Sequence, residues 1–278
     1  IFNMILIFPT RQVNGITVFG FGMTVRGAAL GTALAEAVAA VLGLAYLLKK
    51  SPSLHLRAGE KMHEIKLTIK KAFRIAIPSA IESLIMGGAQ VVQTTIVAPL
   101  GTVSIAANSF AVTAESLCYM PGYGIQSAAV TLIGQCYGAK RHELTRKLGW
   151  LTTISGIVVM TAAGILMYIF APQMIGILSP DPEIRRLGTT VLRIEAFAEP
   201  MFGASIVASG VFRGTGDTLS SMIRNIISMW GVRIPMAAFL STRLGLRGVW
   251  IAMCTELMVR GILFLTHLAG HHWDRVKE

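Results

Sequence analysis

Residues 193–218 read RIEAFAEPMFGASIVASGVFRGTGDT, an apolar stretch that carries two glutamates, Glu195 and Glu199, and a proline directly after the second. Residues four apart share one face of an α-helix, so the two carboxylates repel each other unless one is protonated or a cation lies between them. Ionisable side chains inside membrane-spanning stretches usually serve ions or substrates. This stretch therefore predicts a membrane helix with a binding role.

The rest of the chain has the composition of a membrane protein. Of its 278 residues, 53% are hydrophobic and 14% are charged, and the mean hydropathy is +0.63. Apolar runs near the ~20 residues needed to cross a bilayer recur at residues 27–48, 75–100, 104–133, 148–170, 188–212, 219–240 and 248–269. We therefore expect an all-α, polytopic membrane helix bundle with seven complete spans. The opening residues, IFNMILIF, are too short to span and resemble the tail of a further helix.

The net charge of +11 reflects membrane topology. Lys and Arg cluster in residues 49–74 and 140–147, which places these two connections in the cytoplasm by the positive-inside rule. Residues 101–103 and the connection after Phe170 lack this excess and are expected to face outward. No aromatic residues alternate with the basic ones as in nucleic-acid-binding segments. The expected partner of the basic residues is the anionic bilayer surface, and no nucleic acid is expected.

The cysteines and histidines predict neither a metal site nor a cofactor site. Cys118, Cys136 and Cys254 fall in or at the end of separate apolar spans, with no CxxC motif and no clustered histidines beside them. Neither a disulfide framework nor a zinc site follows from this spacing. We expect no metal and no cofactor other than a coupling ion.

An internal repeat suggests the domain organisation. Residues 22–29 resemble residues 244–250, and Arg26 and Arg247 of the two copies lie 221 residues apart. This period suits one half of a transporter that is built from two repeats. We expect a piece of a longer protein: residues 1–48 from a first lobe, residues 49–74 as a basic cytoplasmic linker, and residues 75–278 as a complete second lobe.

The buried glutamates can be ranked by depth and by their neighbours. Glu115 and Glu199 each lie about eleven residues inside their spans, so about 16 Å deep and near the bilayer midplane. Glu82 heads a helical face continued by Met86, Gln90 and Gln93, which gives this helix a polar stripe. The predicted ion- and substrate-binding residues are therefore Glu82, Gln90, Gln93, Glu115, Glu195 and Glu199.

Other charged residues in the spans have a simpler interpretation. Glu256 has Arg260 one turn later, which predicts an ion pair within one helix. Arg233 is deep and is expected to pair with a carbonyl or a glutamate. Glu36 has no cation one turn away, and its role stays open. Pro121 and Pro200 indicate a cavity or a bent helix, with a static kink as the alternative.

These residues together resemble the multidrug and toxic compound extrusion (MATE) family of secondary transporters over essentially the whole chain. The specific passages are IPSAIE at 77–82, the run from AAN at 106–108 through MPGYG at 120–124 to GQCYGA at 134–139, and the opening stretch at 193–218. They are most similar to the bacterial branch related to DNA-damage-inducible protein F. The family plan has twelve helices in two six-helix lobes, so the chain resembles the end of helix five, helix six and the complete second lobe.

The resemblance implies efflux of organic cations or drugs across a bacterial cytoplasmic membrane in exchange for protons or sodium ions. The family's acids on helices seven, eight and ten carry over as Glu82, Glu115 and the pair Glu195 and Glu199, where sodium is the alternative to a proton. In the sodium-coupled pattern two of these acids lie one turn later, where this chain has Met86 and Phe202, which favours protons. The resemblance also implies that transport requires the first lobe.

Two other functions compete with this interpretation. A lipid-linked oligosaccharide flippase shares the two-lobe plan, and the fold alone does not determine the substrate. Arg233 keeps this alternative open, although the charged residues deep in the spans are mainly glutamates.

The residues Gly214-Thr215-Gly216-Asp217 also match the GxGD signature of intramembrane proteases. Aspartyl catalysis needs a second aspartate at membrane depth, whereas Asp181 and Asp274 lie in a connection and the tail. We expect Asp217 to cap a helix, and we expect no enzyme.

Overall fold

The computed structural model describes residues 6–7, 9–13, 16–49, 65–270 and 273. The chain divides into two compact units, Ile1–Ile65 and Lys66–Glu278. Residues 50–64, most of the predicted basic linker, lie outside the described residues, and the last part of that linker is helical because a helix begins at Ile65. The assignment of the two units to two transporter lobes stays a prediction.

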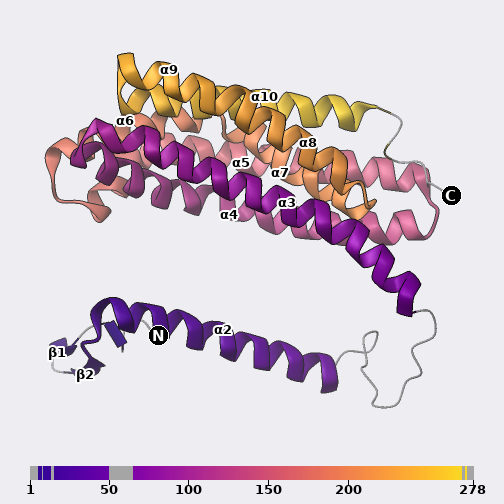
Figure 1. Cartoon of the computed structure of the whole chain (residues 1–278), viewed down its shortest axis with the longest axis horizontal. Coiled ribbons are helices and arrows are strands. Elements are labelled where there is room, and N and C mark those ends of the chain that lie inside the picture. Colours follow the sequence, from indigo (N-terminus) through magenta and orange to yellow (C-terminus); the bar gives the residue numbers. More distant parts are fainter. Residues whose placement is uncertain (1–5, 8, 14–15, 50–64, 271–272, 274–278) are drawn as a thin grey trace. The chain divides into compact units, whose positions relative to one another are not determined.

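The first unit contains a hairpin and one long helix (Figure 1). Strands β1 (Pro9–Val13) and β2 (Ile16–Phe21) pair antiparallel, and α2 follows as Thr24–Lys49. The hairpin was not predicted, although the dipeptide Asn14-Gly15 is a typical hairpin signal. Of the predicted helix tail, Leu6 and Ile7 are helical, and most of the other residues lie outside the described part. Glu36 on α2 is exposed, and its role stays open.

The second unit contains helices that correspond to the six predicted spans after residue 74 (Figure 1). Its elements are α3 (Ile65–Val97), η1 (Ala98–Leu100), α4 (Thr102–Gly138), α5 (His142–Leu178), α6 (Pro182–Ala196), α7 (Glu199–Gly214), α8 (Thr218–Ser228), η2 (Met229–Arg233), α9 (Ile234–Leu244) and α10 (Leu246–Ala269). Two predicted spans are interrupted helices: α6 and α7 form one, and α8, the π-helical turn η2 and α9 form the other. The all-α class is confirmed.

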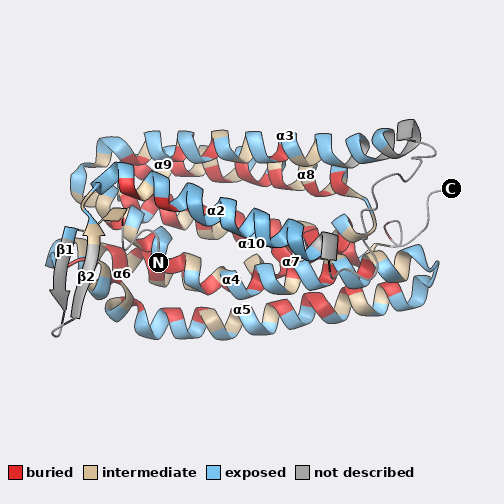
Figure 2. Ribbon diagram, turned by 90° about the horizontal axis from the view of Figure 1, so that it is seen from below, coloured by how far each residue is buried: buried red, intermediate tan, exposed pale blue. Residues whose placement is uncertain are grey.

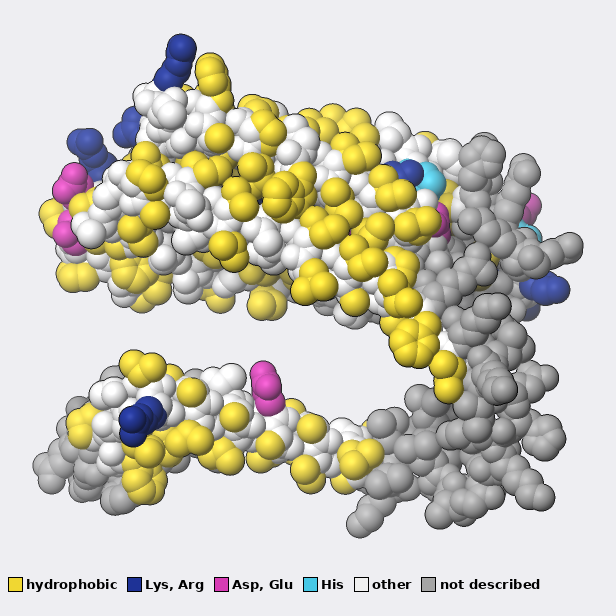
Figure 3. Space-filling view, in the orientation of Figure 1, with side chains coloured by type: hydrophobic (Ala, Val, Ile, Leu, Met, Phe, Trp, Pro, Cys, Tyr) yellow, Lys and Arg dark blue, Asp and Glu magenta, His cyan; other side chains and the backbone are white. Residues whose placement is uncertain are grey.

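Several helices have the length and composition of membrane spans. Among the described residues, four segments are long and apolar enough to cross a bilayer: Thr24–Tyr46, Ala76–Leu100, His142–Leu178 and Leu246–Ala269. The interrupted spans consist of shorter pieces, and α4 carries polar residues along its middle. On the second unit, Figure 3 shows charged side chains mainly at the helix ends and hydrophobic ones between them. This distribution fits a bundle that is surrounded by lipid.

Helices α4, α5, α7 and α10 pack around the core of the second unit. Their inward faces carry most of the buried residues (Figure 2). Trp250 of α10 is fully buried and donates its indole N–H to Asn108 Oδ1 of α4 at 3.0 Å. Glycines let α5 and α7 approach closely: a Cβ on Gly156 would lie 2.5 Å from Val207 Cγ2, and one on Gly203 would lie 2.6 Å from Met160 Cγ. Small residues at such contacts are typical of membrane helix packing.

The α5–α7 contact gives a first stability prediction. Gly156→Leu should lower the unfolding midpoint in detergent by about 2–12 °C, because overpacking a filled interface costs about 1–3 kcal/mol. Gly124→Leu is the matched control, since nothing lies within 4 Å of a Cβ at that helical position. Equal midpoints for the two variants, measured by thermal scanning fluorimetry, would contradict this account of the packing.

The two copies of the predicted repeat share a packing detail. A Cβ on Gly27 would overlap the carbonyl oxygen of Leu6, and a Cβ on Gly248 would overlap the carbonyl oxygen of Leu240. These glycines are equivalent in the 221-residue period that separates Arg26 from Arg247. In both copies, therefore, the glycine after the arginine lets the start of a long helix approach the backbone of an earlier segment closely.

Candidate ion and substrate site

The break between α6 and α7 positions the acidic pair. Glu195 lies in the last turn of α6 and Glu199 opens α7. The Ala198 amide donates to the Glu195 carbonyl at 2.8 Å, which closes the turn between them. Pro200 has no N–H to continue the α6 hydrogen-bond ladder, but it suits the first turn of a helix. The predicted bend is confirmed, and the predicted continuous helix is interrupted between Ala196 and Glu199.

Both acids are buried without a partner. Glu195 and Glu199 are each 1% exposed, and all four of their carboxylate oxygens lack a hydrogen-bond partner among the described residues. Gly164 of α5 packs against the stem of Glu199, where a Cβ would lie 2.9 Å from Glu199 Cβ. An unpaired buried carboxylate is costly. The pair therefore needs protons or a bound cation.

Glu115 of α4 completes an acidic cluster with this pair. It is buried, and it interacts electrostatically with Glu195 and with Glu199. Cys118, about one turn further along α4, interacts with both Glu115 and Glu199. Helix α4 continues through Pro121, so this proline does not break the helix. Three of the predicted site residues, from α4, α6 and α7, therefore lie within electrostatic range of one another.

Arg233 lies between this acidic cluster and a second carboxylate. It ends the π-helical turn η2, it is 7% exposed, and its Nη1 lies 3.9 Å from Glu256 Oε2. It also interacts electrostatically with Glu115 and Glu195. The prediction that Arg233 pairs with a glutamate is confirmed. A π-helical turn is frequent at functional sites because it shifts the helix register locally.

Glu256 and Arg260 form the ion pair predicted from their spacing. The Arg260 Nη2 lies 2.6 Å from Glu256 Oε1, and Arg260 Nε donates to the same oxygen at 2.7 Å. Ser228 of α8 also donates to this carboxylate. Glu256 is fully buried, and these partners compensate its charge. This glutamate joins α8 and α10 rather than offering a free carboxylate.

The charges of the cluster do not balance. The connected group contains four carboxylates, Glu115, Glu195, Glu199 and Glu256, and two guanidinium groups, Arg233 and Arg260. Two carboxylates are therefore left without a fixed cation among the described residues. A low-dielectric interior does not hold two uncompensated negative charges. Protons or mobile cations must supply about two positive charges here.

The predicted stripe on α3 makes separate contacts. Asn225 Nδ2 of α8 donates to Glu82 Oε1 at 2.5 Å, and Arg213 Nη2 of α7 lies 3.6 Å from the same oxygen. Gln93 is buried and its Oε1 has no partner among the described residues, whereas Gln90 is exposed. Among the described residues, Glu82 therefore contacts Asn225 and Arg213 rather than the acids of the cluster. Gln90 does not share the buried face of α3 on which Gln93 lies.

Two contact residues were missed from the sequence. Asn225 and Ser228 hold Glu82 and Glu256, respectively. Both are polar residues inside the apolar run 219–240, and a count of polar residues in that run would have found them. Asp217 behaves as predicted: it caps α8 by accepting from the Ser220 amide at 3.4 Å, and its other oxygen lies 3.5 Å from His267 Nε2.

The fold and site define a membrane-spanning helical bundle with unpaired carboxylates at a helix break, the class of a polytopic transporter. The MatE family model matches residues 78–239, and the chain belongs to this family of multidrug and toxic compound extrusion transporters. It is 30% identical to the probable multidrug resistance protein NorM of Thermotoga maritima, over 92% of this chain and 56% of that protein. It is 26% identical to the uncharacterized transporter YisQ of Bacillus subtilis, over 94% of this chain and 58% of that protein.

Solved structures show the same fold. A crystal structure of MATE in complex with MaD3S superposes with a TM-score of 0.80 at 22% identity, over 89% of this chain and 56% of that chain. The chain thus spans about half the length of the relatives it matches. The prediction that the chain belongs to a family of membrane transporters rather than of enzymes is confirmed. The branch related to DNA-damage-inducible protein F stays a prediction.

Proposed function

We propose that this chain provides the coupling lobe of an antiporter that exports organic cations or drugs in exchange for protons across a bacterial cytoplasmic membrane. The observation that carries the proposal is the pair Glu195 and Glu199, whose four oxygens are buried at a helix break without hydrogen-bond partners among the described residues. Such a pair can hold protons, or an organic cation that displaces them. Competition for one site is sufficient to couple the two fluxes.

The coupling ion is proposed to be the proton, with sodium as the alternative at Glu195 and Glu199. Sodium prefers several oxygen ligands around it, as other hard cations do. Met86 and Phe202 stand where the sodium-coupled pattern has acids. No group of three or more His, Cys, Asp or Glu suited to a metal ion occurs among the residues that the structure describes. Protons need only the carboxylates themselves.

The flippase alternative is weakened by the contacts of Arg233. A carrier of diphosphate-linked lipids needs guanidinium or ammonium groups that are free to bind phosphate. Arg233 is buried, its Nη1 lies 3.9 Å from Glu256 Oε2, and it interacts electrostatically with Glu115 and Glu195. Arg233 is therefore paired with carboxylates and is not free to bind phosphate. The excess of carboxylates around it favours a cationic ligand.

Binding to the purified chain tests the proposal directly. Tetraphenylphosphonium should bind, protons should be released into a weakly buffered solution on binding, and the affinity should fall as the pH falls because protons compete. A sodium-coupled site would instead show competition by sodium at constant pH. Selective binding of an undecaprenyl pyrophosphate lipid, with no binding of tetraphenylphosphonium, would overturn the proposal in favour of the flippase.

The chain alone should insert into membranes but should not transport. Alternating access requires two lobes that move about a shared site, and this chain covers 56% of its NorM relative. Vesicles that contain only this chain should accumulate no ethidium under a proton gradient. Uptake above that of empty vesicles would contradict the requirement for a first lobe; the tetraphenylphosphonium binding assay serves as the control for correct folding.

A further inference from the structure

Three arginines line a cleft that the proposed function does not use. The cleft has a volume of about 330 Å³ and is lined by Arg185, Arg186 and Arg193 of α6, by the threonines 189 and 190 between them, and by Pro172 of α5. Among the described residues, no carboxylate oxygen lies within 4 Å of these guanidinium groups. The carboxylate of the nearby Asp181 accepts hydrogen bonds from the Glu183 and Ile184 amides at the start of α6. The cleft therefore presents unneutralised positive charge.

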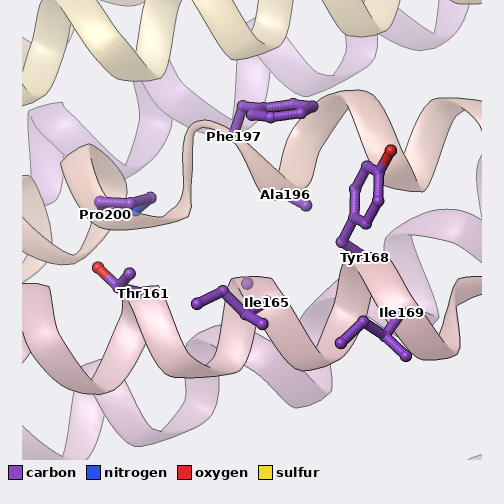
Figure 4. A pocket seen from close by; sticks show the side chains of 8 residues that line it. Thr161, Ile165, Tyr168, Ile169, Ala196, Phe197 and Pro200 are labelled. Atoms are coloured by element: carbon purple, nitrogen blue, oxygen red, sulfur yellow. The ribbon is translucent and has the colours of Figure 1, made fainter.

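An apolar groove lies further along the same two helices. It has a volume of about 320 Å³, and its walls are Ile165, Tyr168 and Ile169 of α5 on one side and Ala196, Phe197 and Pro200 at the α6–α7 break on the other. Figure 4 shows these two sets of side chains facing each other across the groove. Phe197 is 64% exposed and Ile169 is 55% exposed, although both are apolar. Such a groove is suited to a hydrocarbon chain.

A third hollow connects the cleft to the groove. It shares Thr190 and Arg193 with the cleft, and Tyr168 and Phe197 with the groove. Arg193 is held at this junction, since its guanidinium carbon lies 5.2 Å from the centre of the Tyr168 ring and its Nε donates to the Tyr168 carbonyl at 3.2 Å. A cationic region and an apolar region thus form one continuous surface.

We propose that this surface, the α5–α6 lipid site, binds one anionic glycerophospholipid. Its phosphate lies against Arg185, Arg186 and Arg193, and one acyl chain lies in the groove beside the helix break. Arg186 and Phe197 are eleven positions apart and so about 16 Å apart along a helix, which matches one leaflet of a hydrocarbon core about 30 Å thick. An organic cation, the proposed transport substrate, would be repelled by the arginines, so the site is distinct from the acidic cluster.

The lipid site can be tested on the purified full chain. The chain in detergent is titrated with phosphatidylglycerol, phosphatidylcholine or glycerol phosphate, and bound ligand is counted by native mass spectrometry. Phosphatidylglycerol should be retained preferentially. The double substitution Arg185→Gln/Arg186→Gln should weaken its binding about 25-fold, because each basic residue near an anionic lipid surface contributes about fivefold. Ile169→Ser should weaken it severalfold through the loss of acyl contact.

Matched variants separate the site from general charge and hydrophobicity. Arg243→Gln/Arg247→Gln removes the same charge from two other exposed arginines, and Ile154→Ser changes an α5 isoleucine that is 51% exposed and lies outside the groove. Both controls should bind phosphatidylglycerol like the unchanged chain. The proposal is overturned by equal retention of phosphatidylcholine, by glycerol phosphate binding as tightly as phosphatidylglycerol, or by a control that weakens binding as much as its site variant.

Discussion

Glu199→Gln is expected to lower the affinity of the chain for tetraphenylphosphonium about 100-fold and to reduce proton release on binding. The amide has nearly the shape of the carboxylate but carries no charge. Losing one partner of a buried charge pair costs about 2–5 kcal/mol. Glu199 is 1% exposed and its oxygens have no hydrogen-bond partner among the described residues. No existing contact of these oxygens in the described part is lost, so the fold should tolerate the change.

Glu183→Gln is the matched control for Glu199→Gln. It makes the same chemical change on an exposed residue of α6, and it should leave both affinity and proton release unchanged. The two measurements are isothermal titration with tetraphenylphosphonium in two buffers of different ionisation enthalpy. Unchanged affinity and unchanged proton release in Glu199→Gln would reduce the acidic pair to a packing feature and would remove the basis of the antiport proposal.

Properties that depend on local sequence were predictable. Apolar runs identified the spans because length and composition alone decide whether a helix can cross a bilayer. The spacing of Glu256 and Arg260 predicted their ion pair because residues four apart are neighbours on any helix. Pro200 predicted the bend between α6 and α7 because proline cannot donate to the helix ladder. The last two features depend on interactions between residues within one or two turns of the same helix.

Contacts between distant elements were not predictable from the sequence alone. Glu82 and Asn225 are 143 residues apart, and their hydrogen bond depends on how α3 packs against α8. The position of Arg233 between Glu256 and the acidic cluster depends on the π-helical turn η2. No pattern in the sequence predicted this turn. The two halves of the predicted polar stripe separate for the same reason: burial of Gln93 and exposure of Gln90 follow from tertiary packing.

Arg260→Met is expected to destabilise the chain more than any other substitution considered for the cluster. The Arg260 side chain is 9% exposed and contacts the fully buried carboxylate of Glu256 at 2.6 Å. Breaking a buried pair by removing one partner costs about 3–5 kcal/mol, because an uncompensated charge stays behind. The unfolding midpoint in detergent should therefore fall by about 6–20 °C.

The double substitution Glu256→Gln/Arg260→Met should recover most of that loss, because it removes both charges and leaves an amide that Ser228 can still contact. Arg233 then loses its carboxylate partner at 3.9 Å and keeps its interactions with Glu115 and Glu195. Because one carboxylate and one guanidinium group are removed together, two carboxylates of the cluster still lack a fixed cation, and the number of protons released when tetraphenylphosphonium binds should not change. Recovery of stability with a changed proton count would mean that Glu256 itself takes part in the exchange site, and failure to recover stability would mean that the pair is held for its packing rather than its charge.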